Sequence, residues 1–124
     1  MSNRAADWAE RAAALYDERY AQRYRAHDNE LSNSEPARLF TEWLERVCSA
    51  AAPPIDVLDL GCGTGRYFWA VIGARSLVGL DASGAMLEEA RHPYRRDRIT
   101  APMTLIHGDL FTYDFGPSRF DLVY

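Results

Sequence analysis

A hydrophobic stretch that leads directly into a glycine-rich segment limits what this chain can fold into. Residues 57–65 read Val-Leu-Asp-Leu-Gly-Cys-Gly-Thr-Gly, so an apolar run ends in three glycines that alternate with other residues. A buried parallel strand is typically a continuous apolar run, and a glycine-rich turn after it lets the backbone approach a ligand closely. The segment therefore predicts an α/β fold with a ligand site at the carboxyl end of this strand.

The same loop argues against a phosphate ligand. Asp59 precedes the first glycine, and Arg66 stands where the third glycine of the dinucleotide-binding fingerprint would fall. A carboxylate would repel a pyrophosphate but attract a ligand that carries an ammonium or sulfonium group. We therefore expect a cationic ligand, with Asp59 acting on its ammonium group through charge or through a water. The alternative for Asp59 is a cap of the loop.

Strands and helices alternate after residue 55. The expected strands are 55–60, 77–81, 103–107 and 120–124, and the expected helices between them are 65–73 and 84–91. Ser83 would cap the second of these helices, and Pro93 would end it. Such alternation predicts a parallel sheet with right-handed crossovers.

The first 54 residues predict two helices. In the stretch 4–27, aromatic and small residues recur every fourth position, which indicates one helix with an aromatic stripe: Trp8, Ala12, Tyr16, Tyr20 and Tyr24. A second helix is expected over 35–49 with Ser34 as its N-cap, and the polar segment 28–33 would join the two. We assign four large aromatic residues to core or helix packing: Trp8, Trp43, Phe68 and Trp69.

Four motifs occur in an order that resembles class I S-adenosylmethionine-dependent methyltransferases. They are the segment 59–65, Leu80-Asp81, Gly108-Asp109 and the run Phe120-Asp121-Leu122-Val123. The resemblance is strong over 55–124 and weak over 1–54. It implies a Rossmann-like parallel sheet with strand order 3-2-1-4, S-adenosyl-L-methionine as the cofactor and S-adenosyl-L-homocysteine as the product. Members of this family usually continue through three further strands, so the sheet is expected to be incomplete and the chain truncated.

The resemblance also implies roles for individual residues near the strand ends. The loop against the methionine part of the cofactor would comprise Gly61, Cys62, Gly63, Thr64 and Gly65. Asp81 follows Asp59 by 22 residues, at the strand end where a carboxylate accepts hydrogen bonds from ribose hydroxyls in nucleoside-binding folds. The alternative for Asp81 is a helix cap ahead of Ser83.

The adenine and the mouth of the pocket involve further candidates. Ala82 and Met86 would flank the adenine, although a methionine at helical spacing is at least as often a core residue. The adenine edge would be read by three residues that could instead form an ordinary turn: Gly108, Asp109 and Leu110. Tyr16 and Tyr24 would close the pocket and bond the cofactor carboxylate through a hydroxyl. Their alternative is an aromatic stripe that packs on the sheet.

Composition excludes several classes of function. All 14 basic residues are arginines, against 18 acidic residues, and the net charge of −4 leaves no basic surface for nucleic acid. The two cysteines, Cys48 and Cys62, lack a metal-ligand spacing, so no metal is expected and a reducing, cytoplasmic setting fits best. No apolar run approaches the roughly 18 residues of a membrane span, and we expect a soluble protein without membrane partners.

These observations favour methyl transfer to a small molecule, by in-line attack of an acceptor on the sulfonium methyl, with this chain supplying the cofactor-binding half. No residue can be named as a catalytic base. The alternative is a non-catalytic cofactor-binding half-domain that completes its sheet with a partner, or as a homodimer through an exposed fourth strand. A nucleotide-dependent oxidoreductase is disfavoured by Asp59 and Arg66.

Overall fold

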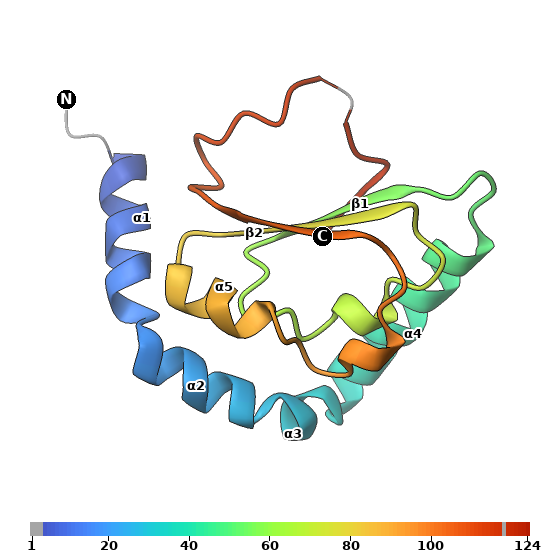
Figure 1. Ribbon diagram of the computed structural model, residues 1–124, viewed down its shortest axis with the longest axis horizontal. Coiled ribbons are helices and arrows are strands. Elements are labelled where there is room, and N and C mark those ends of the chain that lie inside the picture. Colours follow the sequence, from blue (N-terminus) through green and yellow to red (C-terminus); the bar gives the residue numbers. More distant parts are fainter. Residues whose placement is uncertain (1–3, 118) are drawn as a thin grey trace.

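A four-stranded parallel sheet forms the centre of the computed structural model, which describes residues 4–117 and 119–124. Its strands are β1 (Asp56–Leu60), β2 (Ser76–Asp81), β3 (Met103–His107) and β4 (Leu122–Val123). Their order, β3-β2-β1-β4, confirms the predicted Rossmann-like α/β fold with 3-2-1-4 order (Figure 1). Asp59 pairs with Gly79 and Leu60 with Leu80, so β1 and β2 end at the same edge of the sheet.

The connections between the strands differ in how well the sequence predicted them. α5 (Gly84–Ala90) has Ser83 as its N-cap, as expected, because the Ser83 hydroxyl accepts a hydrogen bond from the Met86 amide. The α-helix expected over 65–73 is wrong. Turns and a short 3-10 helix, η1 (Phe68–Ala70), replace it. Here backbone amides donate their hydrogen bonds to carbonyls three residues back, as from Phe68 to Gly65. A second 3-10 turn, η2 (Arg96–Arg98), precedes β3.

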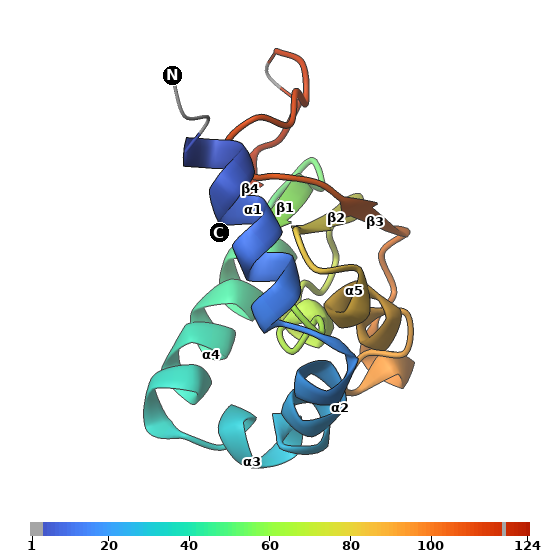
Figure 2. The ribbon, with the colours of Figure 1, turned by 90° about the vertical axis from the view of Figure 1, so that its left-hand side faces the viewer.

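The amino-terminal region forms four helices rather than two. They are α1 (Arg4–Leu15), α2 (Glu18–Ala26), α3 (Asp28–Ser32) and α4 (Glu35–Ala50). The single helix expected over 4–27 is wrong because Asp17 is extended and its carboxylate accepts a hydrogen bond from the Tyr20 amide, which starts a new helix. Figures 1 and 2 show these helices following one another around one side of the molecule. We call α1, α2 and α3 the covering helices.

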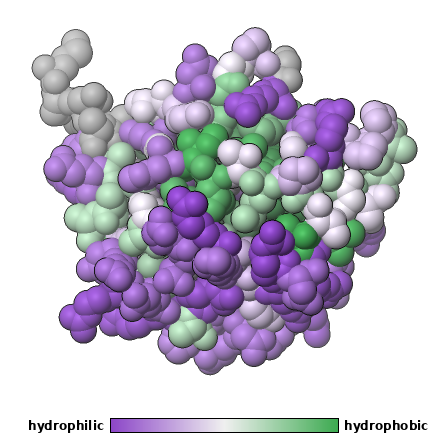
Figure 3. Space-filling model, in the orientation of Figure 1, coloured by the Kyte–Doolittle hydropathy of each residue, from purple (hydrophilic) through white to green (hydrophobic). Residues whose placement is uncertain are grey.

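The hydrophobic core lies between β1, β2 and the helices packed on them. Its most buried members include Leu44, Cys48, Val57, Phe68, Trp69, Leu77 and Leu87. Phe68 and Trp69 are core residues, which is one of the two expected placements. Trp8 and Trp43 are 48% and 40% exposed and lie outside the core; Trp43 packs on Phe40 of the same helix, and Trp8 packs on Phe111. Hydrophobic residues also gather over the sheet on the face shown in Figure 3, above hydrophilic side chains over α2 and α5. In the described part of the chain, no helix has the length and apolar character needed to cross a bilayer.

Candidate functional site

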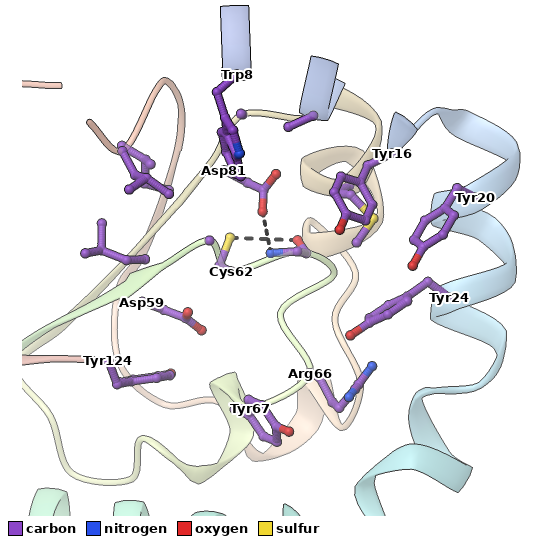
Figure 4. A pocket seen from close by; sticks show the side chains of 18 of the residues that line it. Trp8, Tyr16, Tyr20, Tyr24, Asp59, Cys62, Arg66, Tyr67, Asp81 and Tyr124 are labelled. Carbon is purple, nitrogen blue, oxygen red and sulfur yellow. Dashed lines mark hydrogen bonds between the residues drawn. The ribbon is translucent and has the colours of Figure 1, made fainter. Parts of the chain in front are cut away.

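A cavity of about 610 Å³ opens at the carboxyl ends of β1 and β2. The glycine loop after β1 forms one wall, and α1 and α2 form another (Figure 4). The lining includes ten of the residues that the sequence predicted for the site: Tyr16, Tyr24, Asp59, Gly61, Cys62, Gly63, Asp81, Ala82, Met86 and Leu110. The fold therefore brings most of the predicted residues to one concave place.

Backbone hydrogen bonds fasten the glycine loop to the end of β2. The amides of Gly61 and Cys62 both donate to the Leu80 carbonyl, at 2.8 and 3.0 Å. Gly61 and Gly63 have φ angles of +69° and +57°, which L side chains rarely adopt. A Cβ atom on Gly63 would also lie 3.2 Å from the Met86 methyl carbon. The loop thus keeps its backbone at the cavity wall.

Asp81 joins the loop to the start of α5. One carboxylate oxygen accepts from the Gly63 amide and the other from the Ser83 amide, both at 2.8 Å. The bond to Ser83 is the capping contact that the sequence left open as an alternative. Each oxygen of a carboxylate has two lone pairs, so each keeps one for a further donor in the cavity. The ribose role of Asp81 therefore stays a prediction that its geometry allows.

Asp59 lies at the floor of the cavity and is almost fully buried, at 6% exposure. This burial raises the pKa of its carboxyl to about 8; the neighbouring Tyr124 hydroxyl lowers it, and the negative charge of Asp81 raises it. The Tyr124 hydroxyl is buried and makes no hydrogen bond with the described residues. A cation bound beside Asp59 would favour the ionised form of this carboxyl.

Four aromatic side chains of α1, the α1–α2 turn and α2 face the cavity: Trp8, Tyr16, Tyr20 and Tyr24 (Figure 4). The rings of Tyr16 and Tyr20 meet edge to face at 4.9 Å between centroids. Ser83 fixes the turn between the two helices, because its hydroxyl donates to the Tyr16 carbonyl. Trp8 packs edge to face on Phe111, 5.6 Å between centroids. The stripe predicted from the sequence thus forms a wall of the cavity.

A buried polar cluster joins the covering helices to the glycine loop. Asp28, at the start of α3, is fully buried. Its carboxylate accepts hydrogen bonds from the Thr64 hydroxyl at 2.9 Å and from Arg66 Nε at 3.2 Å. Arg25 Nη1 lies 3.7 Å from a carboxylate oxygen of Asp28. Burial raises the pKa of Asp28 above its usual value, and these neighbours offset only part of the rise.

Four predicted site residues lie outside the cavity lining. Thr64 is fully buried and turned toward Asp28, and Gly65 lies against the Phe68 ring. Gly108 and Asp109 follow β3, where the Asp109 carboxylate accepts a hydrogen bond from the Phe111 amide at 2.9 Å. That contact is the ordinary turn which the sequence offered as its alternative. Of the three acids that the sequence predicted for the site, Asp59 and Asp81 line the cavity and Asp109 does not.

The sequence analysis missed several residues that shape the site. Gly79 is one, because a Cβ there would lie 2.9 Å from both the Cys62 sulfur and the Phe68 ring. A glycine inside an apolar strand is a signal for such a close approach. Arg66 lines the cavity, although the sequence treated it only as a missing glycine. Asp28 gave no signal, since an acid in a polar segment is usually exposed.

The chain belongs to the methyltransferase domain family, whose profile matches residues 57–124, just over half of the sequence. It is similar to malonyl-[acyl-carrier protein] O-methyltransferase from Pectobacterium atrosepticum, at 31% identity over 92% of this chain and 37% of that protein. It is also similar to sterol 24-C-methyltransferase from Debaryomyces hansenii, at 33% identity over 56% of this chain and 19% of that protein. The chain therefore spans well under half the length of these relatives.

Solved structures share the fold. Magnesium protoporphyrin IX methyltransferase from Synechocystis, with bound S-adenosylhomocysteine, has a TM-score of 0.69 at 20% identity, covering 93% of this chain and 56% of that one. N-methyltransferase NodS from Bradyrhizobium japonicum, also in complex with S-adenosylhomocysteine, has a TM-score of 0.61 at 18% identity, covering 86% and 54%. The methyltransferase family agrees with S-adenosyl-L-methionine as the cofactor.

The residues that line the cavity suit that cofactor. Asp81 keeps acceptor capacity for hydroxyl groups, and Asp59 is a buried acid that an ammonium group would ionise. The glycine loop holds its backbone against the cavity, and Ala82 and Met86 add an apolar wall. Among the described residues, no three His, Cys, Asp or Glu side chains are grouped so as to hold a metal ion.

Proposed function

We propose that the protein takes part in S-adenosylmethionine-dependent methyl transfer to a small molecule. The observation that carries the proposal is the convergence of the glycine loop, two acids from adjacent strand ends and an aromatic wall on one cavity. In this proposal residues 55–124 bind the cofactor and residues 1–54 cover it; residues 1–3 lie outside the described part. Residues of α1 and α2 line the cavity, which supports this division.

Each element of the cavity has a proposed part in holding the cofactor. Asp81 would accept from the ribose hydroxyls, and Asp59 would pair with the ammonium group. Ala82, Met86 and Leu110 would contact the adenine, and the tyrosines of the covering helices would exclude water. The bound cofactor supplies a methyl group on a positively charged sulfur, which is already activated for displacement. The chain's own contribution is then alignment and a dry cavity.

The acceptor is proposed as a small molecule for two reasons. The curated relatives are named for a sterol and for a malonyl group on a carrier protein. In this chain the exposed ring of Trp8 lines the cavity and packs on the exposed ring of Phe111, an apolar pair that suits an acceptor with apolar parts. Pairing of β4 with a second chain, as a homodimer, stays a prediction, as does a cytoplasmic location.

Calorimetric titration with S-adenosylhomocysteine tests the proposal. The chain is expected to bind it, and Asp81→Ala is expected to weaken binding by about 1–3 kcal/mol, because a charged acceptor is lost. Asp114→Ala is a matched control: Asp114 also accepts from a backbone amide, that of Gly116, but in a loop outside the cavity lining. Absence of binding to the folded wild-type chain would refute the proposed function. Equal affinities of the two variants would leave Asp81 as a cap only.

A further inference from the structure

Arg66 is the only basic side chain among the described residues that line the cavity. The other charged lining residues are the acids Asp59 and Asp81. Figure 4 shows Arg66 on a different side of the cavity from both acids, with its guanidinium directed toward Tyr24. The cavity therefore has acidic side chains that can bind a cation in one part and the positive charge of Arg66 in another.

The surroundings of Arg66 hold its side chain in place without using all of its donors. The side chain is only 12% exposed, and Nε donates to the Asp28 carboxylate at 3.2 Å. The guanidinium lies over the Tyr24 ring, 4.5 Å from its centroid. Its Nη2 atom is buried and has no hydrogen-bond partner among the described residues. An unpaired buried donor is costly, and a charged one more so.

We propose that Arg66 binds a carboxylate of the ligand in this cavity and that Asp28 positions Arg66 for this task. A guanidinium is always charged and presents its N–H groups in a plane that matches a carboxylate. A carboxylate that enters the cavity beside Arg66 would pair with its guanidinium, while the acids Asp59 and Asp81, on other sides of the cavity, would face the cationic part of the ligand. The inference rests on the proposed function. The carboxylate belongs either to the amino-acid part of the cofactor or to an acidic acceptor.

The test compares two ligands that differ in one carboxylate. S-adenosylhomocysteine and its decarboxylated analogue, which keeps the ammonium group and the nucleoside, are titrated into wild-type protein and into Arg66→Gln. The glutamine amide retains a donor for Asp28. If Arg66 binds the cofactor carboxylate, the substitution weakens S-adenosylhomocysteine by about ten- to a hundredfold and leaves the affinity for the analogue unchanged. Arg66→Lys should lie between the two, because it keeps the charge without the planar fork.

A second arm examines an acidic acceptor, with malonate as the probe on protein saturated with S-adenosylhomocysteine. Loss of malonate binding in Arg66→Gln, with cofactor affinity intact, supports the proposal and assigns the carboxylate to the acceptor. Arg38→Gln, on the exposed side of α4, controls for the change in net charge. The proposal is overturned if Arg66→Gln binds every probe like the wild type, or loses both nucleosides equally. Wild-type protein that binds no nucleoside refutes the proposed function instead.

Discussion

Asp59 couples the stability of the protein to pH. Burial raises the pKa of its carboxyl in the folded state to about 8, above the 3.8 of an ordinary carboxyl. At pH values between these two, the folded chain keeps a proton on Asp59 that the unfolded chain has released. The unfolded state therefore binds fewer protons over this window, and the free energy of unfolding falls as the pH rises through it. For one such group the fall is at most about 1.4 kcal/mol per pH unit.

Asp59→Asn is expected to remove this dependence, because the amide cannot ionise. Urea unfolding between about pH 5 and 8 should show a flatter profile for the variant and a higher stability than wild type at the alkaline end. Asp56→Asn is the control: the Arg75 guanidinium hydrogen-bonded to Asp56 lowers the pKa of that carboxyl to about 2, so its contribution is constant over this window. Parallel profiles for wild type and Asp59→Asn would contradict the prediction.

The three acids at or near the carboxyl ends of successive strands show what single residues reveal in a sequence. Their positions at strand ends were predictable, because an apolar run that stops at a polar residue marks the edge of a parallel sheet. Their partners were not. Asp81 bonds two backbone amides, Asp59 is nearly removed from solvent, and Asp109 turns back on its own loop. These differences depend on how the glycine loop and the covering helices pack, which spacing along the chain does not encode.

At the scale of elements, the break between α1 and α2 positions the aromatic wall. Residues at every fourth position share one face of a helix, and the stripe predicted a single continuous helix. The Asp17 carboxylate starts a second helix instead, and the carbonyl of Tyr16 is held by Ser83. The sequence contained this signal, since an aspartate three residues before Tyr20 is an N-cap pattern, but the aromatic periodicity masked it.

Asp17→Ala is expected to lower the free energy of unfolding by about 1 kcal/mol, because the first amides of α2 lose their acceptor. Asp7→Ala changes the same charge in α1 and removes only an exposed pair with Arg11, so it should cost at most a few tenths of a kcal/mol. Urea unfolding of both variants measures the difference. An equal cost for the two would mean that the α1–α2 break does not depend on the Asp17 cap.

At the scale of the molecule, the sheet could be predicted and the placement of the covering helices could not. Alternating apolar strands and helices indicate a parallel sheet with right-handed crossovers, and the resemblance to class I methyltransferases implied its strand order. The covering helices are fastened to the glycine loop by Asp28, which lies 36 and 38 residues before its partners Thr64 and Arg66. Nothing in a polar segment indicates that one of its acids is buried in a distant contact.

Asp28→Asn tests whether residues 1–54 and 55–124 open separately. The variant leaves the Arg66 charge without its buried partner, and such losses cost about 3–5 kcal/mol when a pair is broken outright. If the covering helices open on their own, hydrogen exchange of amides in α2 and α3 should speed up at least tenfold, because the free energy of local opening falls. The amides of β1 and β2 should then keep their protection. Asp7→Asn, on the exposed side of α1, should change neither. Equal acceleration in the strands would show one cooperative unit and refute the proposed division.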